Sequence, residues 1–260
     1  MLAVGPVPAP VISAARIPYR VPEDHELPAR LPPVLAVVYL VYNAGHDGDA
    51  DSSLCAEAIR LARLLAALMP DEGEVAGLLA LLLLVEARRG SRIARDGSLV
   101  LLADQDRSRW DRALTDEGHA IVRACLRRDR PGPYQVQAAI QAVHTDAATF
   151  EATEWSQIVA LYDQLVALAP TPVVALNRAI AVGEVDGPAA ALALVDHLDL
   201  DGYHALHATR ADLLRRLGRA GEAAAAFERA AELAPTEAER EFLRSGGRRG
   251  RMSTRVAAQE

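Results

Sequence analysis

Uncharged hydrogen-bonding side chains gather in one short stretch of this 260-residue chain, directly after Gly132-Pro133. Gly-Pro ends a preceding element and favours a helix start, because proline at the first helical position gives up no needed N–H. From there the spacing is helical. The polar face carries Tyr134, Gln137, Gln141 and His144, and the apolar face carries Val136, Ile140, Val143 and Ala147. Such a polar row is typical either of a hydrated helix–helix contact or of a ligand groove, and both interpretations stay open.

A second polar cluster, residues 104–111, precedes this stretch. A helix is predicted to start near Asp106, which places Trp110 one turn further along. Two interpretations remain open. Either Asp106 and Arg107 form surface ion pairs that contribute little to stability, or Gln105, Asp106 and Arg107 face the same cleft as the polar row.

Histidines offer metal-ligand chemistry only in weak patterns. His144 lies near Asp146, and a second group consists of His197, His204 and His207. No Glu-x-x-His or His-Glu-x-x-His frame accompanies either group, so a third ligand would have to come from elsewhere. A phosphate-binding glycine loop, a nucleophile elbow and a paired-carboxylate motif are also absent from the sequence. We therefore expect no enzymatic activity, no metal site and no cofactor.

Composition narrows the class of protein. Hydrophobic residues make up 51% of the chain but aromatic ones only 4%, a balance that suits close-packed helices. The net charge of −7 argues against binding duplex nucleic acid through broad phosphate neutralisation. Cys55 and Cys125 stand apart from other metal-ligand residues, which is typical of a reducing cytoplasm. The longest apolar run, 75–85, is too short to cross a bilayer, and residues 1–15 lack the basic start of a signal peptide. We expect a soluble cytoplasmic protein with no membrane contact.

Helical periodicity divides the chain into four stretches. Residues 1–33 are rich in proline and are predicted to form an extended arm. Residues 34–150 are predicted to form a helical bundle, and residues 151–245 to form tetratricopeptide-like helix pairs. Residues 246–260 are rich in glycine and arginine and are predicted to be a disordered tail. The predicted fold class is all-α, a helical array in which an N-terminal bundle is followed by antiparallel helix pairs.

The individual helices are bounded by capping residues and prolines. They are predicted at about 34–43, 53–69, 72–88, 155–169, 172–182, 188–198, 203–217, 219–233 and 236–244. The repeat assignment depends on spacing that is typical of tetratricopeptide repeats. The residues at that spacing are Ala211, Gly218, Ala223, Phe227, Ala230 and Pro235. Gly218 is expected to make the turn, Ala211 and Ala223 to let two helices approach, and Phe227 and Ala230 to reach the next repeat.

Several motifs occur together in one order. They are Ile17-Pro18-Tyr19-Arg20-Val21-Pro22, Tyr39-Leu40-Val41-Tyr42-Asn43-Ala44-Gly45-His46, Gln105-Asp106-Arg107 with Trp110, Gly132-Pro133-Tyr134-Gln135-Val136-Gln137-Ala138-Ala139-Ile140, and Pro172-Val173-Val174-Ala175-Leu176-Asn177-Arg178-Ala179. Over about 16–245 the chain resembles the long C-terminal extension, ending in tetratricopeptide-like repeats, of a group of bacterial extracytoplasmic-function RNA polymerase sigma factors. The resemblance implies a regulatory or partner-binding module without catalytic chemistry. Its implied partners are the sigma regions, core polymerase or a small regulatory protein.

The chain departs from that family in two ways. Where the family usually has Asn-Glu-Gly-Tyr, this chain has Asn43-Ala44-Gly45-His46, so any role of that glutamate is absent. In addition, sigma regions 2 and 4 are missing, and no basic recognition helix is found elsewhere. We therefore expect no direct DNA binding by this chain alone. It is a shortened version of a longer protein, the product of a wrongly placed start, or a free-standing regulatory remnant.

The predicted function is a non-catalytic regulatory module that modulates sigma activity through partner or intramolecular binding. Helical-repeat concavities bind partners through extended surfaces. The candidate binding residues are Asn43, Gln105, Asp106, Arg107, Trp110, Tyr134, Gln137, Gln141, His144, Asn177 and Arg178. The alternative is a small-molecule or metal-binding sensor or enzyme that uses the polar cleft around Gln105–Arg107 and Tyr134–His144. Nucleic-acid binding through the arginine-rich segment 244–255 is a third option.

Overall fold

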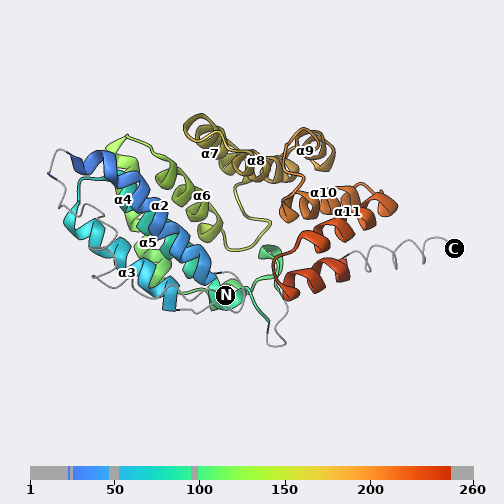
Figure 1. The fold of residues 1–260 in the computed structure, drawn as a ribbon, viewed down its shortest axis with the longest axis horizontal. Coiled ribbons are helices and arrows are strands. Elements are labelled where there is room, and N and C mark those ends of the chain that lie inside the picture. Colours follow the sequence, from blue (N-terminus) through green and yellow to red (C-terminus); the bar gives the residue numbers. More distant parts are fainter. Residues whose placement is uncertain (1–22, 24–25, 47–52, 95–98, 247–260) are drawn as a thin grey trace, which may run out of the picture. The chain divides into compact units, whose positions relative to one another are not determined.

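The computed structural model describes residues 23, 26–46, 53–94 and 99–246. The chain divides into two compact units, residues 1–37 and 38–260. Throughout the described residues the regular elements are helices, apart from one isolated antiparallel bridge between Ile93 and Leu99. The predicted all-α class is therefore confirmed (Figure 1). None of the helices in these ranges is long and apolar enough to cross a membrane.

Helix α2, Leu27–His46, begins earlier than the predicted start at residue 34. Residues 27–33 are therefore helical rather than extended, although Pro32 and Pro33 lie inside the helix. The reason is that buried side chains recur at helical spacing through the prolines, at Leu31, Leu35, Val38 and Tyr42. The rest of the predicted arm, the motif 17–22 and nearly all of the predicted tail lie outside the described residues.

Helix α4, Gly73–Glu86, is the centre of the predicted bundle. Its buried residues are Val75 and Gly77–Leu84. A helix that is apolar on all sides must be surrounded by other elements. The most extensive contacts of α4 are with α3 (Ser53–Leu68), α5 (Arg112–Arg128) and α6 (Pro133–Asp146) (Figure 1).

The contact between α4 and α6 is close and specific. A Cβ atom added at Gly77 would lie 2.6 Å from the backbone N of Gln135, so only glycine fits there without a shift. One turn earlier, the Glu74 carboxylate accepts the backbone N–H of Tyr134 at 3.0 Å and that of Gln135 at 3.2 Å. A carboxylate at a helix N-terminus satisfies free N–H groups and complements the helix dipole. Glu74 thus caps α6 from a neighbouring helix.

Three short 3-10 turns connect α4 to α5. They are η2 (Arg89–Ser91), η3 (Leu102–Asp104) and η4 (Arg107–Arg109). The prediction of a helix running from Asp106 through Trp110 was wrong. Asp106 accepts the N–H of Ser108 at 3.0 Å and caps only η4, the backbone of Trp110 is extended, and Asp111 accepts the N–H of Leu114 at 3.1 Å to start α5. The segment contains two successive aspartate caps. We expected the long helix to start at the first of them, Asp106, but it starts after the second, Asp111.

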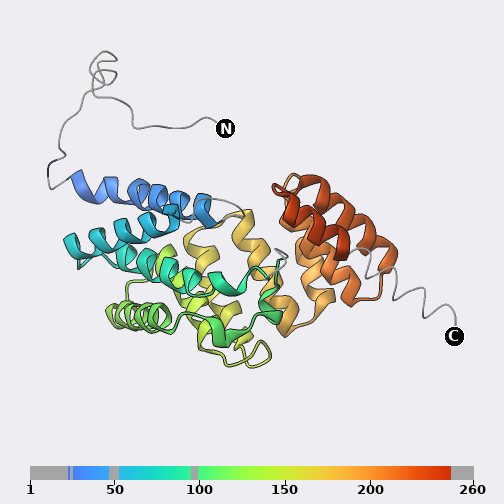
Figure 2. The same cartoon turned by 90° about the horizontal axis from the view of Figure 1, so that it is seen from below.

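The C-terminal half consists of helices that pair with their neighbours in sequence. These are α7 (Trp155–Leu168), α8 (Pro172–Val185), α9 (Pro188–Val195), α10 (His204–Arg216) and α11 (Ala220–Leu233), followed by a helix at 237–246. Helices α10 and α11 run side by side (Figure 2). Between them Gly218 has a φ of +72°, and Ala211 and Ala223 are buried in the hydrophobic core to which both helices contribute. These predicted turn and packing roles are confirmed.

We expect Gly77→Ala to lower the free energy of unfolding by about 1–3 kcal/mol, because the added methyl group displaces the backbone of α6. Urea-induced unfolding followed by circular dichroism measures the change. Gly221→Ala is the matched control, since a Cβ atom there meets nothing within 4 Å. The control variant should have the same free energy of unfolding as the wild-type chain, or a slightly higher one. Equal effects of the two variants would contradict the close α4–α6 contact.

Candidate functional site

Six polar or aromatic residues meet where the C-terminal end of α4, turn η4 and the C-terminal end of α6 come together. We call them the junction cluster: Arg88, Gln105, Arg107, Trp110, Gln141 and His144. Nη2 of Arg88 donates to Oε1 of Gln141. Nη1 of Arg107 donates to the backbone oxygens of His144 at 2.7 Å and Ala147 at 2.6 Å. Segments far apart in sequence are thus joined by the two guanidinium groups.

Arg107 caps the end of α6. A cation close to the last carbonyl groups of a helix is favourable because the helix dipole is negative there. Its Cζ atom also lies 4.7 Å from the ring centroid of Trp110, within cation–π range. Asp106, by contrast, is exposed and bonds to Ser108 on its own turn. Of the predicted trio 105–107, Arg107 is the residue that bonds to α6.

His144 is only 9% exposed, and its ring lies edge-on to Trp155 at 5.2 Å. Burial lowers the pKa of His144 to about 4, and the charges of Arg88 and Arg107 act in the same direction. The imidazole is therefore neutral at neutral pH. Its Nδ1 atom is buried and has no hydrogen-bond partner in the described part of the chain.

Buried polar atoms without a partner concentrate in the junction cluster. They are Arg88 Nε, Gln105 Oε1, Arg107 Nη2, Trp110 Nε1 and His144 Nδ1. In folded proteins such atoms are nearly always paired, so each one calls for a physical reason. Arg88 is the strongest case: burial lowers its pKa to about 10, helped by the charges of Arg92 and Arg107. Within the described ranges no carboxylate forms an ion pair with Arg88.

Beside Arg88 lies a cavity of about 420 Å³. Its polar lining is provided by Arg88, Arg92 and Gln105. The apolar lining consists of Val85, Leu99, Val100, Leu101, Leu102 and Phe242. Two cations, one amide and an apolar wall make a chemical environment for an anion with an apolar neighbour.

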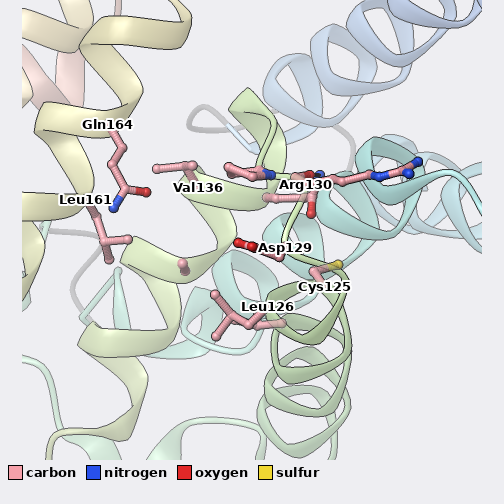
Figure 3. A pocket seen from close by; sticks show the side chains of 11 residues that line it. Cys125, Leu126, Asp129, Arg130, Val136, Leu161 and Gln164 are labelled. Carbon is pink, nitrogen blue, oxygen red and sulfur yellow. Dashed lines mark hydrogen bonds between the residues drawn. The ribbon is translucent and has the colours of Figure 1, made fainter.

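A second, smaller groove of about 230 Å³ lies among α5, α6 and α7 (Figure 3). Leu126 and Asp129 from the end of α5 line it opposite Leu161 and Gln164 of α7, with Val136 between them. None of the buried, unpartnered polar atoms found in the described residues belongs to its lining. The groove is also below the usual size of small-molecule pockets. The 420 Å³ cavity is therefore the better candidate site.

The structure separates the predicted polar row of α6 into two ends. Gln141 and His144 belong to the junction cluster, whereas Tyr134 and Gln137 lie near the start of the helix. The ring of Tyr134 packs edge-on against Tyr39 at 5.8 Å, and the Gln137 amide donates to the Pro133 carbonyl at 3.3 Å. The row does not form one continuous cleft with residues 105–107.

The remaining predicted residues have local environments of their own. Asn43 is half-buried on α2, and Asn177 is exposed on α8. Nε of Arg178 donates to Oδ1 of Asp163 at 2.6 Å and so links α8 to α7. None of these three residues forms a hydrogen bond with the junction cluster.

Sequence reasoning did not single out Arg88 and Arg92 as candidate site residues. A signal was present, because Arg88 follows directly on the apolar run 75–85. A side chain attached so soon after a fully buried helix remains close to the core. Arginine at such a position needs an internal partner or a ligand.

We predict that His144 makes the protein less stable in mild acid. The unfolded chain takes up a proton below pH 6.5 while the folded ring stays neutral down to about pH 4. The free energy of unfolding should therefore fall by about 2 kcal/mol between pH 7 and pH 5 through this residue, and level off below its folded pKa. Urea unfolding at several pH values measures the effect. In His144→Gln the fall in the free energy of unfolding between pH 7 and pH 5 should be smaller by that amount. His197→Gln is the control, because His197 is exposed. If the free energy of unfolding of His144→Gln depended on pH as in the wild-type chain, the assignment would be refuted.

Comparison with known proteins finds two similarities. A family model described as "Family of unknown function (DUF6596)" matches residues 30–126, a range that contains Arg88, Arg92 and Gln105. The chain is 45% identical over 240 residues to "Uncharacterized protein R00370" of Rhizobium meliloti (strain 1021). That alignment covers 90% of this chain and 57% of the relative, so the chain spans less than two thirds of the curated relative that it matches. No solved structure matches the chain.

Proposed function

We propose that this chain is a non-catalytic regulatory module that binds a protein partner, within a sigma-factor-like transcription initiation protein. The observation that carries the proposal is Arg88, a half-buried cation whose Nε atom is buried, which has no carboxylate partner among the described residues and lines a cavity with Arg92 and Gln105. The partner would supply an acidic residue to the two guanidinium groups. Apolar residues next to that acid would cover the leucine, valine and phenylalanine side chains of the cavity wall.

The energetics favour binding of this kind. An uncompensated buried charge costs the folded protein several kcal/mol. A carboxylate that reaches Arg88 and Arg92 offsets that cost in the complex, and arginine can hold it with two parallel hydrogen bonds. Burial of the apolar wall adds about 25 cal/mol for each Å² removed from water. The free chain is thus less stable at this point than the bound chain.

Two further observations support a regulatory, partner-binding role. Paired helices such as α10 and α11 belong to an architecture that binds proteins through extended surfaces. In addition, about 43% of the Rhizobium meliloti relative lies outside the matched region, since the match covers 57%. By the family resemblance, the partner is a set of sigma regions, core polymerase or a small regulatory protein. These partners imply a cytoplasmic setting.

A small anionic molecule is the second candidate ligand. The cavity volume of about 420 Å³ lies within the range of small-molecule sites. A carboxylate or phosphate compound with an apolar part would engage the same arginines. Competition between such a compound and the protein partner distinguishes the two ligands.

The test uses the part of the Rhizobium meliloti relative that lies outside the match, produced as a separate protein. Isothermal titration calorimetry with the complete 260-residue chain should give saturable 1:1 binding. Arg88→Met should weaken this binding at least tenfold, because it leaves the partner's acid without its counter-ion. The same variant should unfold at an equal or higher temperature, because the buried unpaired charge is gone.

Arg60→Met is the matched control, since Arg60 is exposed and forms a salt bridge with Glu57 on its own helix. It should leave binding unchanged. Absence of binding by the wild-type chain would overturn the proposed partner interaction. Equal binding by the Arg88 and Arg60 variants would overturn the role of the cavity. Binding of glutamate or phosphate alone, without binding of the protein segment, would favour the small-molecule candidate.

A further inference from the structure

A separate cluster of potential metal ligands joins three helices. His46 lies at the end of α2, Cys55 lies near the start of α3, and Glu86 is the last residue of α4. One ligand atom from each lies within 4.8 Å of those from the other two. Cys55 is fully buried, and the other two residues are half-buried. We propose that His46, Cys55 and Glu86 bind a zinc ion.

The donor set fits zinc better than the other common divalent ions. Zinc takes imidazole nitrogen, thiolate sulfur and carboxylate oxygen at about 2.0–2.3 Å, in a tetrahedral arrangement. Ligand atoms on such an ion lie about 3.5 Å apart, so the three groups need to close by about 1 Å. Calcium and magnesium prefer oxygen ligands alone. The fourth position would be filled by water.

His46 supplies an observation that points to a missing ligand. Both of its ring nitrogens are buried, and neither has a hydrogen-bond partner in the part of the chain that the structure describes. Buried imidazole nitrogens are normally paired, so a metal ion on one of them would remove the anomaly. The ring stacks on Tyr42, with centroids 5.2 Å apart and planes at 24°, and this contact fixes its orientation. Burial and three neighbouring arginines lower the pKa of His46 to about 3, so the ring has the neutral form that a metal requires.

The surroundings of Glu86 resemble the outer shell of a metal site. The Tyr42 hydroxyl donates to Oε2 of Glu86 at 3.0 Å, and Nη1 of Arg89 donates to Oε1 at 3.3 Å. Nη2 of Arg89 also donates to the carbonyl of Gly45, next to His46. Hydrogen bonds of this kind orient ligating carboxylates. Arg89 therefore holds the ends of α2 and α4 in the arrangement that the ion would use.

Charge also balances at the proposed site. Zinc binding displaces the proton of the Cys55 thiol, which passes to the solvent buffer. The thiolate, the Glu86 carboxylate, the neutral imidazole and the dication then form a group with no net charge. Such a group does not repel the guanidinium groups of Arg88, Arg89 and Arg92.

The complete chain, freed of metal by a chelator and dialysed, provides the test. Titration with Co²⁺ should saturate at one ion per chain and produce a thiolate-to-cobalt charge-transfer band, which Zn²⁺ then abolishes by displacement. Cys55→Ser should remove the band, and His46→Gln should weaken binding at least tenfold. Cys125→Ser is the matched control, because Cys125 is the other cysteine and is also buried. It should bind cobalt as the wild-type chain does.

Two results would overturn the proposal: a folded wild-type chain without the charge-transfer band, or a band that survives in Cys55→Ser. A second measurement covers the case in which Cys55→Ser does not fold. Alkylation of the wild-type chain, mapped by peptide mass spectrometry, should proceed at least tenfold more slowly at Cys55 when zinc is present. The rate at Cys125 should stay the same. Equal alkylation of Cys55 with and without zinc would contradict the site.

Discussion

The burial of most of α4 is the constraint from which the arrangement of the bundle follows. With apolar side chains on every face, this helix must be enclosed by α3, α5 and α6. Gly77 and Glu74 then fix α6 against it, one through backbone contact and the other through an N-terminal cap. Because the chain leaves α4 directly into Arg88, a cation is placed against the core. The candidate site is thus a consequence of how the helix ends.

Electrostatics at that end explain why the candidate site carries a cation without a matching carboxylate among the described residues. Glu86, the acid in the last turn of α4, already bonds to Tyr42 and Arg89. Arg88 is left with the neutral amide of Gln141, and Arg107 with backbone carbonyls. Burial lowers the pKa values of both His46 and His144, and the positive charges of nearby arginines act in the same direction.

Much of the fold could be predicted from the sequence, but the site only in part. Gly132-Pro133 predicted the start of α6, and the spacing around Gly218 predicted the α10–α11 pair, because both depend on local pattern. The start of α2 was predicted too late, because Pro32 and Pro33 indicated an extended chain although Leu31 and Leu35 follow helical spacing. Arg107 was recognised, yet its contact with the end of α6 spans 37 residues, and Arg88 carried no motif. His46, Cys55 and Glu86 lie on three different helices, so only the tertiary fold brings them together.

The most direct test of the account is an NMR titration that observes the arginine Nε–H groups. The chain, labelled with ¹⁵N-arginine, would be titrated with the unmatched segment of the Rhizobium meliloti relative, and the Arg88 signal assigned by its loss in Arg88→Met. Because the buried Nε–H of Arg88 has no partner among the residues that the structure describes, we expect its signal to shift and to saturate at one equivalent. Binding of the segment without any change at Arg88 would contradict the account.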